Sequence, residues 1–198
     1  MMKWPAMRHL GEIAWTEGSG VVLADSNAAA RWPVSVFDGG YAGFLDIPGF
    51  FEGCHGREWQ SEDTRFLIWF ALDDNPVDVW RIDDRTVLLQ QCFLDDYSDP
   101  GRAVSLLRSL AELEAHSDEL IGTVTVNVPG VVAFPAAIEW AEIAEQVVSG
   151  GDGVELTTQL GGRDGGVLFH LPVGSYSCFT SSLEWTGCEV ERLTLRPD

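Results

Sequence analysis

Paired carboxylates are the residues of this sequence with the clearest potential for chemistry. Aspartate doublets follow predicted strands at three places: Asp73-Asp74, Asp83-Asp84 and Asp95-Asp96. Neighbouring carboxylates can act as a general acid and base or bind calcium or magnesium. The simpler interpretation is solvated turns, because aspartate side chains accept hydrogen bonds from nearby backbone. A third interpretation needs no catalytic geometry: an acidic surface that binds a basic protein.

Tryptophan is the second unusual feature, with eight copies among 198 residues. Five of them occur in apolar patterns typical of a core: Trp15, Trp32, Trp69, Trp80 and Trp140. Trp59 and Trp185 occur instead in polar segments that we predict to be loops. An exposed aromatic side chain beside acidic residues is typical of an anchor at a protein interface. Partial burial at the base of a loop is the alternative interpretation.

Other catalytic and ligand-binding patterns are missing or incomplete. The four histidines are separated by long gaps, and the adjacent Cys54 and His55 would point to opposite faces of a strand. The sequence has no Gly-x-Ser-x-Gly turn for a nucleophilic serine. Its glycine clusters lead into predicted strands rather than helices, unlike phosphate-binding loops. We therefore expect no catalytic residues, no metal ligands and no cofactor.

The net charge excludes some classes of partner. The chain has 12 basic and 31 acidic residues, a formal charge of −19 at pH 7, divided as −9 over residues 1–98 and −10 over residues 99–198. Nucleic acids and anionic membranes are repelled by such a surface, so we expect neither as a partner. A positively charged protein is the natural candidate. The scarcity of lysine, with one copy, is a source of acidity that needs no partner.

The sequence predicts a cytoplasmic protein. It contains no run of about 18 apolar residues, and its first ten residues lack the apolar centre of a signal peptide. The four cysteines include no Cys-x-x-Cys pair, so we expect reduced thiols, mostly in the core.

Short strands dominate the predicted secondary structure. One hairpin is expected from Glu12–Glu17 and Val21–Ala24 around Gly18-Ser19-Gly20, and another from Val77–Ile82 and Thr86–Leu94 around Asp83-Asp84-Arg85. Arg65–Leu72 is nearly all apolar, as in a strand buried on both faces. Further strands are expected at residues 41–47, 153–160, 167–171, 175–180 and 188–195.

The principal predicted helix covers residues 101–115. Asp99 can cap it, Pro100 suits its first turn, and its leucines follow helical spacing. Two shorter helices are predicted, at Ser26–Arg31 with Asp25 as cap, and at Ala136–Val147 after Pro135.

A weak internal repeat relates the two halves of the chain. Residues 13–32 (IAWTEGSGVVLADSNAAARW) and 123–140 (TVTVNVPGVVAFPAAIEW) each read as a strand, a tight turn, a Gly-Val-Val strand and a tryptophan. Gly20 and Gly130 occupy equivalent places in the two segments. The pattern predicts two similar halves, and two ordinary hairpins are the alternative.

Several segments resemble immunity protein 21, a family of bacterial polymorphic-toxin immunity proteins. They are GSGVVLADSNAAARW, GYAGFLDIP, DNPVDVW, VLLQQCFLDD, GTVTVNVPGVVAFPAA and LPVGSYSCFT, in the family's order from Trp15 to Arg196. The resemblance implies a protein that neutralises a toxin, in many cases a basic nuclease, by covering or distorting its active site. It implies no catalytic residues in the inhibitor.

The expected fold is α+β, with mostly antiparallel β-sheets, one principal helix at about residues 101–115 and two pseudo-repeated halves. We expect a single immunity-type domain over residues 1–198, with sub-halves 12–98 and 120–198 joined by that helix. The expected partner is a cognate toxin domain, bound by the three aspartate doublets with Trp59 and Trp185 as anchors. A metal-dependent hydrolase and a stand-alone protein-binding domain are the alternatives.

Overall fold

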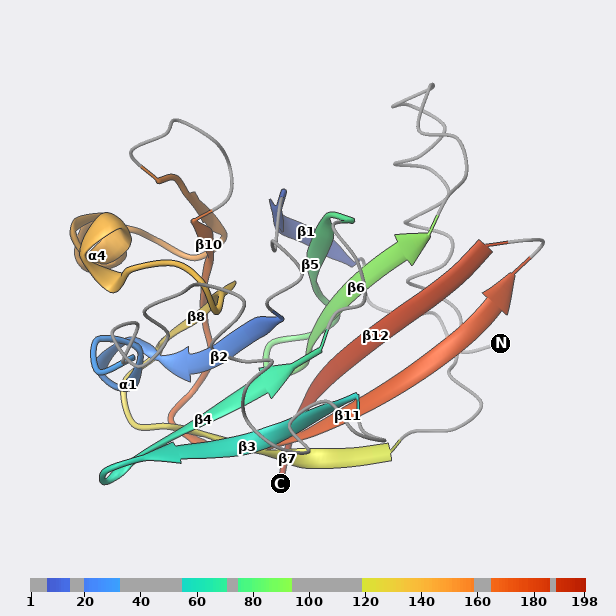
Figure 1. Cartoon of the computed structure of the whole chain (residues 1–198), viewed down its shortest axis with the longest axis horizontal. Coiled ribbons are helices and arrows are strands. Elements are labelled where there is room, and N and C mark those ends of the chain that lie inside the picture. The colour runs from blue at the N-terminus through green and yellow to red at the C-terminus, as the bar shows by residue number, and fades with distance from the viewer. Residues whose placement is uncertain are drawn as a thin grey trace.

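The chain folds mainly into antiparallel β-sheet (Figure 1). The computed structural model describes residues 7–14, 20–32, 55–70, 75–93, 119–158, 165–185 and 188–198. Within these ranges the strands form two six-stranded sheets, here named sheet A and sheet B. The same ranges contain two helices, α1 (Ser26–Ala29) and α4 (Trp140–Ser149).

Each sheet contains strands from both halves of the sequence. Sheet A has the order β1 (Arg8–Ile13), β5 (Val77–Arg81), β6 (Val87–Phe93), β12 (Cys188–Pro197), β11 (Gly174–Trp185) and β7 (Glu119–Val126). Sheet B has the order β3 (Gly56–Ser61), β4 (Thr64–Trp69), β2 (Val21–Asp25), β8 (Gly130–Pro135), β10 (Gly166–His170) and β9 (Val154–Leu156).

The central strands of sheet B are buried on both faces, which explains their continuous apolar runs. In β2, Leu23 belongs to the apolar cluster between the two sheets, whereas its neighbour Val22 belongs to the cluster under the helices. Successive side chains of a strand point to opposite faces, so one strand serves both clusters. From α4, Ile143 and Val147 contribute to the second cluster. The described structure is therefore layered as helices, sheet B and sheet A.

Three predictions are confirmed: the β5–β6 hairpin, the buried strand at β4 and the helix capped by Asp25. The two strands pair antiparallel, with Val79 opposite Leu89. At the start of α1, Asp25 Oδ1 accepts a hydrogen bond of 2.8 Å from the backbone N–H of Ala28. The predicted strand at 41–47 and the principal helix at 101–115 lie outside the described residues.

The predicted hairpin around Gly18-Ser19-Gly20 is wrong. The strand before this segment ends at Ile13 and belongs to sheet A, whereas β2 belongs to sheet B. The connection therefore passes from one sheet to the other, which a local turn pattern does not reveal. The start of the second short helix is also wrong, because Pro135 is the last residue of β8 and α4 begins at Trp140.

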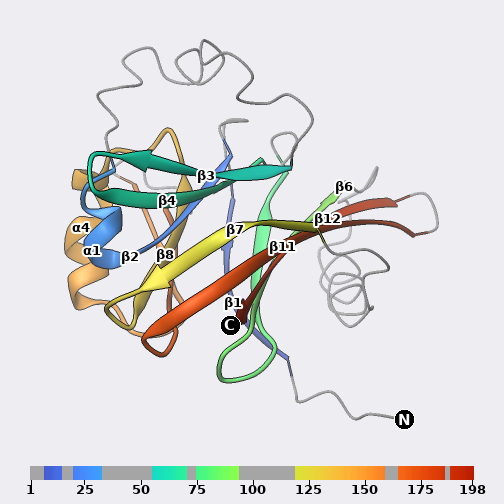
Figure 2. The same cartoon turned by 90° about the horizontal axis from the view of Figure 1, so that it is seen from below.

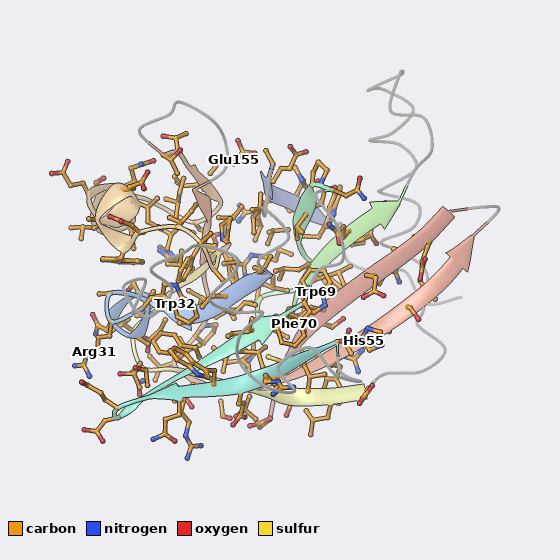
Figure 3. The ribbon with its side chains drawn as sticks, viewed as in Figure 1. Arg31, Trp32, His55, Trp69, Phe70 and Glu155 are labelled. Atoms are coloured by element: carbon orange, nitrogen blue, oxygen red, sulfur yellow. The ribbon has the colours of Figure 1, made fainter. Side chains whose placement is uncertain are left out.

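The two sheets meet at both edges through glutamate side chains. At the edge where β3 lies against β7, Glu58 of β3 accepts two hydrogen bonds from Thr123 of β7. Its Oε1 lies 2.8 Å from the backbone nitrogen and 2.9 Å from the hydroxyl oxygen. At the other edge, Glu155 Oε1 accepts a bond of 3.1 Å from the backbone N–H of Glu12. Figure 2 shows β7 alongside β3 and β4, and Figure 3 shows Glu155 beside β1.

Glycine is required where each glutamate crosses to the other sheet. A Cβ atom at Gly122 would lie 2.6 Å from Glu58 Cγ and 2.9 Å from Leu67 Cδ1. A Cβ atom at Gly11 would lie 2.7 Å from Glu155 Cγ. Carbon atoms at such distances overlap. Any other residue at Gly11 or Gly122 must therefore displace the junction, meaning the contact between the glycine and the glutamate of the opposite sheet.

Replacement of Gly122 by alanine tests this requirement. We expect Gly122→Ala to lower the free energy of unfolding by about 1–3 kcal/mol through overpacking. Gly151→Ala is the matched control, because no atom lies within 4 Å of a Cβ built at that position. Urea unfolding of the two variants measures the difference, and equal stabilities would contradict the prediction.

Candidate functional site

The aspartate doublet at residues 83–84 is exposed in the turn between β5 and β6. Asp83 Oδ1 accepts a hydrogen bond of 2.8 Å from the backbone N–H of Arg85, so this side chain helps to shape the turn. The doublets Asp73-Asp74 and Asp95-Asp96 lie outside the described residues. A common acidic surface formed by all three doublets therefore stays a prediction.

The two candidate anchor tryptophans are in strands, not in loops, which corrects the sequence interpretation. Trp59 lies in β3, is half-buried, and packs with ring centroids 5.2 Å from Trp32 and 5.8 Å from Phe66. Its polar neighbours arise because β3 is an edge strand with one face to solvent. Trp185 is the last residue of β11, and its side chain lies outside the described set.

The structure reveals a polar cavity that the sequence gives no reason to expect. Its volume is about 400 Å³, and it is bounded by the end of β2, helix α1, the β3–β4 turn and β7. Nine of its lining residues carry polar side chains: Asp25, Asn27, Arg31, Asp63, Thr64, Arg65, Thr123, Thr125 and Asn127. These residues come from four elements and the segments next to them, and they are separated by up to 102 positions in the sequence.

Asp25 fixes the floor of this cavity. Its side chain is 1% exposed. Besides capping α1 through Oδ1, it accepts bonds through Oδ2 from the backbone N–H of Asn127, at 2.8 Å, and from Asn127 Nδ2, at 3.1 Å. Three donors therefore satisfy the buried carboxylate, as burial of a charged group requires. The same bonds join α1 to the segment that follows β7.

Two arginines line the cavity with exposed side chains. Arg31 lies at the end of α1, on the side of the molecule where the β3–β4 turn is found (Figure 3). Arg65 is the second residue of β4. Among the described residues, neither guanidinium has an ion pair or a side-chain hydrogen bond. Each guanidinium therefore keeps its planar set of donors available to a ligand.

A buried carboxyl group lies where β12 meets the start of β3. The Glu191 side chain is 2% exposed, and its Oε2 lies 3.5 Å from Nδ1 of His55. Burial raises the pKa of Glu191 and the charge of Glu189 adds to this effect, while His55 opposes both. A buried acid beside a half-exposed histidine is an arrangement that can serve general acid–base catalysis.

A second histidine–carboxylate pair joins β1 to β5. His9 Nε2 lies 2.7 Å from Asp78 Oδ1, and this hydrogen bond is the main cause that raises the pKa of His9. The imidazole ring lies 4.6 Å from the ring of Trp80. Sequence reasoning missed both pairs, because the partners are 69 and 136 residues apart and only the strand arrangement brings them together.

The described ranges were searched for metal ligands, membrane-spanning helices and free cysteines. There, no group of three or more His, Cys, Asp or Glu side chains is arranged to hold a metal ion. No helix in these ranges has the length and apolar character needed to cross a membrane. Cys92 and Cys178 are buried free thiols, which confirms the expectation for those two residues.

Known proteins give no further guide to the site. A scan against protein-family models, a search of curated proteins and a search of solved structures each find no match.

Replacement of Glu191 by glutamine is expected to flatten the pH dependence of stability. Because the pKa of Glu191 is raised in the folded protein, its contribution to stability is complete below the unfolded pKa of about 4.3. That contribution is lost as the pH rises through the higher folded value. Relative to Glu191→Gln, the natural protein should therefore become less stable as the pH rises towards neutrality.

Urea unfolding at a series of pH values between about 4 and 8 measures this difference. Glu62→Gln in the exposed β3–β4 turn is the control, and it should follow the natural protein at every pH. If the free energy of unfolding of Glu191→Gln and of the natural protein changed equally with pH, the prediction would be contradicted.

Proposed function

We propose that this protein is a non-enzymatic immunity protein that binds and neutralises a cognate bacterial toxin, a basic one, in the cytoplasm. The observation that carries the proposal is the surplus of exposed carboxylates without a basic partner. Ion pairs between described residues engage the carboxylates of Asp78, Asp152 and Glu191. Within the same ranges, other carboxylates form no ion pair, among them the exposed Glu62, Asp63, Glu139 and Glu145 and the half-buried Glu142.

These five carboxylates lie at one end of the molecule. Figures 1 and 2 both place α4, α1 and the β3–β4 turn at this end. Glu139 is the N-cap residue of α4, and Glu142 and Glu145 follow at intervals of three residues, while Ile143 and Val147 face the core. Glu142 lies in the first turn, where a carboxylate interacts favourably with the helix dipole.

The electrostatic field of an unpaired acidic surface attracts a basic protein before the two proteins touch. Opposite net charges raise association rates by long-range attraction, and mutual charge complementarity disfavours wrong partners. Inhibition of the toxin then needs only coverage of its active site, which requires no chemistry from the inhibitor. The order of motifs shared with immunity protein 21 supports the same function.

Neutralisation of the α4 glutamates tests the proposed surface. We expect the triple variant Glu139→Gln, Glu142→Gln, Glu145→Gln to slow association with the cognate toxin domain by about tenfold at low salt. The salt dependence of the rate should weaken in parallel. Surface plasmon resonance at several salt concentrations measures both quantities.

Glu119→Gln, in β7 of sheet A, is the control for loss of charge at an exposed site outside this surface. It should change association less than the α4 variant. An unchanged rate in the α4 variant would exclude this surface. Full toxin activity in the presence of excess natural protein would overturn the immunity function itself.

We also infer that the chain consists of two equivalent halves. The strand orders support this inference, because the order β1-β5-β6 in sheet A corresponds to β7-β11-β12, and β3-β4-β2 in sheet B corresponds to β9-β10-β8. The six strands of the first half therefore match those of the second half in chain order. The central pairing of sheet B, from Val21 with Pro135 to Asp25 with Val131, is symmetric about Leu23 and Ala133.

Individual residues at the edges of the sheets support the same inference. In β1, the pairing register skips Leu10 just before Gly11, and in β7 it skips Ile121 just before Gly122. Each glycine then faces a glutamate of the opposite sheet, as described above. A bulge, a glycine and a crossing glutamate thus recur in the same arrangement at both edges.

Equivalent junctions should respond equally to the same substitution. We expect Gly11→Ala to lower the free energy of unfolding by an amount similar to Gly122→Ala, about 1–3 kcal/mol. The reason is that each new Cβ would overlap with a glutamate Cγ atom at nearly the same distance. Urea unfolding of both variants measures the effect, and a loss at one junction alone would contradict equivalence.

A further inference from the structure

We propose that the cavity between α1, the β3–β4 turn and β7 binds the carboxylate or phosphate group of a small ligand through Arg31 and Arg65. This site is additional to the proposed toxin-binding surface and does not depend on it. The volume of about 400 Å³ is within the range of about 300–1,000 Å³ that is usual for small-molecule sites.

The scarcity of bases makes the pair of arginines informative. The chain has 12 basic residues against 31 acidic ones, so a guanidinium has many carboxylates with which it can pair. Arg8 and Arg81, for example, both pair with Asp152. Arg31 and Arg65 nevertheless form no ion pair among the described residues, and both line the same cavity. A guanidinium binds carboxylate or phosphate oxygens in a planar, two-bond geometry.

The remaining polar lining favours an anion or is neutral towards it. Asn27, Thr64 and Thr125 place amide or hydroxyl donors around the cavity. Asp25 already accepts bonds from three N–H groups, which offset its charge locally. Asp63, the other carboxylate of the lining, lies exposed in the β3–β4 turn, where water screens it.

Comparison of the two halves shows that the fold does not require this lining. If the halves are equivalent as proposed above, Arg65 corresponds to Gly165 and Asp25 to Pro135. In β7, Thr125 corresponds to Ala14, which follows β1. The backbone arrangement thus accepts small or apolar residues at these places. Asp25 is explained by its cap of α1 and its bonds to Asn127, whereas Arg65, which has no ion pair among the described residues, is explained by a ligand.

Binding of simple anions tests the site directly. Inorganic phosphate and succinate are titrated separately into the natural protein by isothermal calorimetry, with the ionic strength held constant by sodium chloride. We expect at least one of them to bind with a dissociation constant of about 10 mM or lower. Binding of phosphate alone identifies a phosphate ligand, and binding of succinate alone identifies a carboxylate ligand.

Three single variants decide whether the arginines are responsible. Arg31→Gln and Arg65→Gln should each weaken binding at least tenfold. Arg85→Gln is the matched control, because Arg85 also lacks an ion pair among the described residues but lies in the β5–β6 turn, away from the cavity. Circular dichroism melting without ligand verifies that each variant is folded.

Two results would overturn the proposal. One is the absence of binding for both anions up to about 10 mM. The other is an equal loss of affinity in Arg85→Gln and in the two cavity variants, which would show only general attraction to positive charge. Neither result affects the toxin-binding proposal, which depends on other residues and another partner.

Discussion

Two glutamate side chains hold the edges of this fold together. An edge strand presents backbone N–H groups that are open to pairing with another chain. Here the partner is a carboxylate of the opposite sheet, from Glu58 for β7 and from Glu155 for β1. Each side chain reaches the backbone because glycine leaves room for it. The sheets therefore close on each other at both edges, and the residues of the apolar cluster between them are buried.

This closure explains which parts of the fold the sequence could predict. Local patterns correctly indicated the β5–β6 hairpin, the Asp25 cap and the strand at β4, because each depends on neighbouring residues. Gly18-Ser19-Gly20 has the pattern of a hairpin turn, but β1 belongs to sheet A and β2 to sheet B. The sheet that each strand joins depends on its partner: β1 pairs with β5 and β2 pairs with β4. Both partners are distant in sequence. Polar alternation in β3 was likewise mistaken for a loop, although it marks an edge strand with Trp59 packed inward.

The candidate sites could be predicted from the sequence even less than the fold. A doublet such as Asp83-Asp84 is visible in the sequence, and the structure gives Asp83 a role in its turn. The cavity has no local signal, because Asp25, Arg31, Arg65 and Thr125 belong to separate elements. The pairing of His55 with Glu191 also depends on the arrangement of β3 and β12. Sequence spacing can identify sites whose residues lie on one element, whereas these sites are assembled by pairing between strands.

Charge acts over two different ranges in this molecule. At physiological salt the screening length is about 8 Å, so a protein that approaches α4 experiences the combined field of several carboxylates. A ligand inside the cavity instead contacts Arg31 and Arg65 directly, and a two-bond guanidinium contact outweighs the screened field of more distant acids. The net charge of −19 therefore predicts the sign of a protein partner but not the sign of a ligand in the cavity. An acidic protein can hold a local anion site where two arginines form no ion pair and the nearby carboxylates are hydrogen-bonded, as Asp25 is, or exposed to solvent, as Asp63 is.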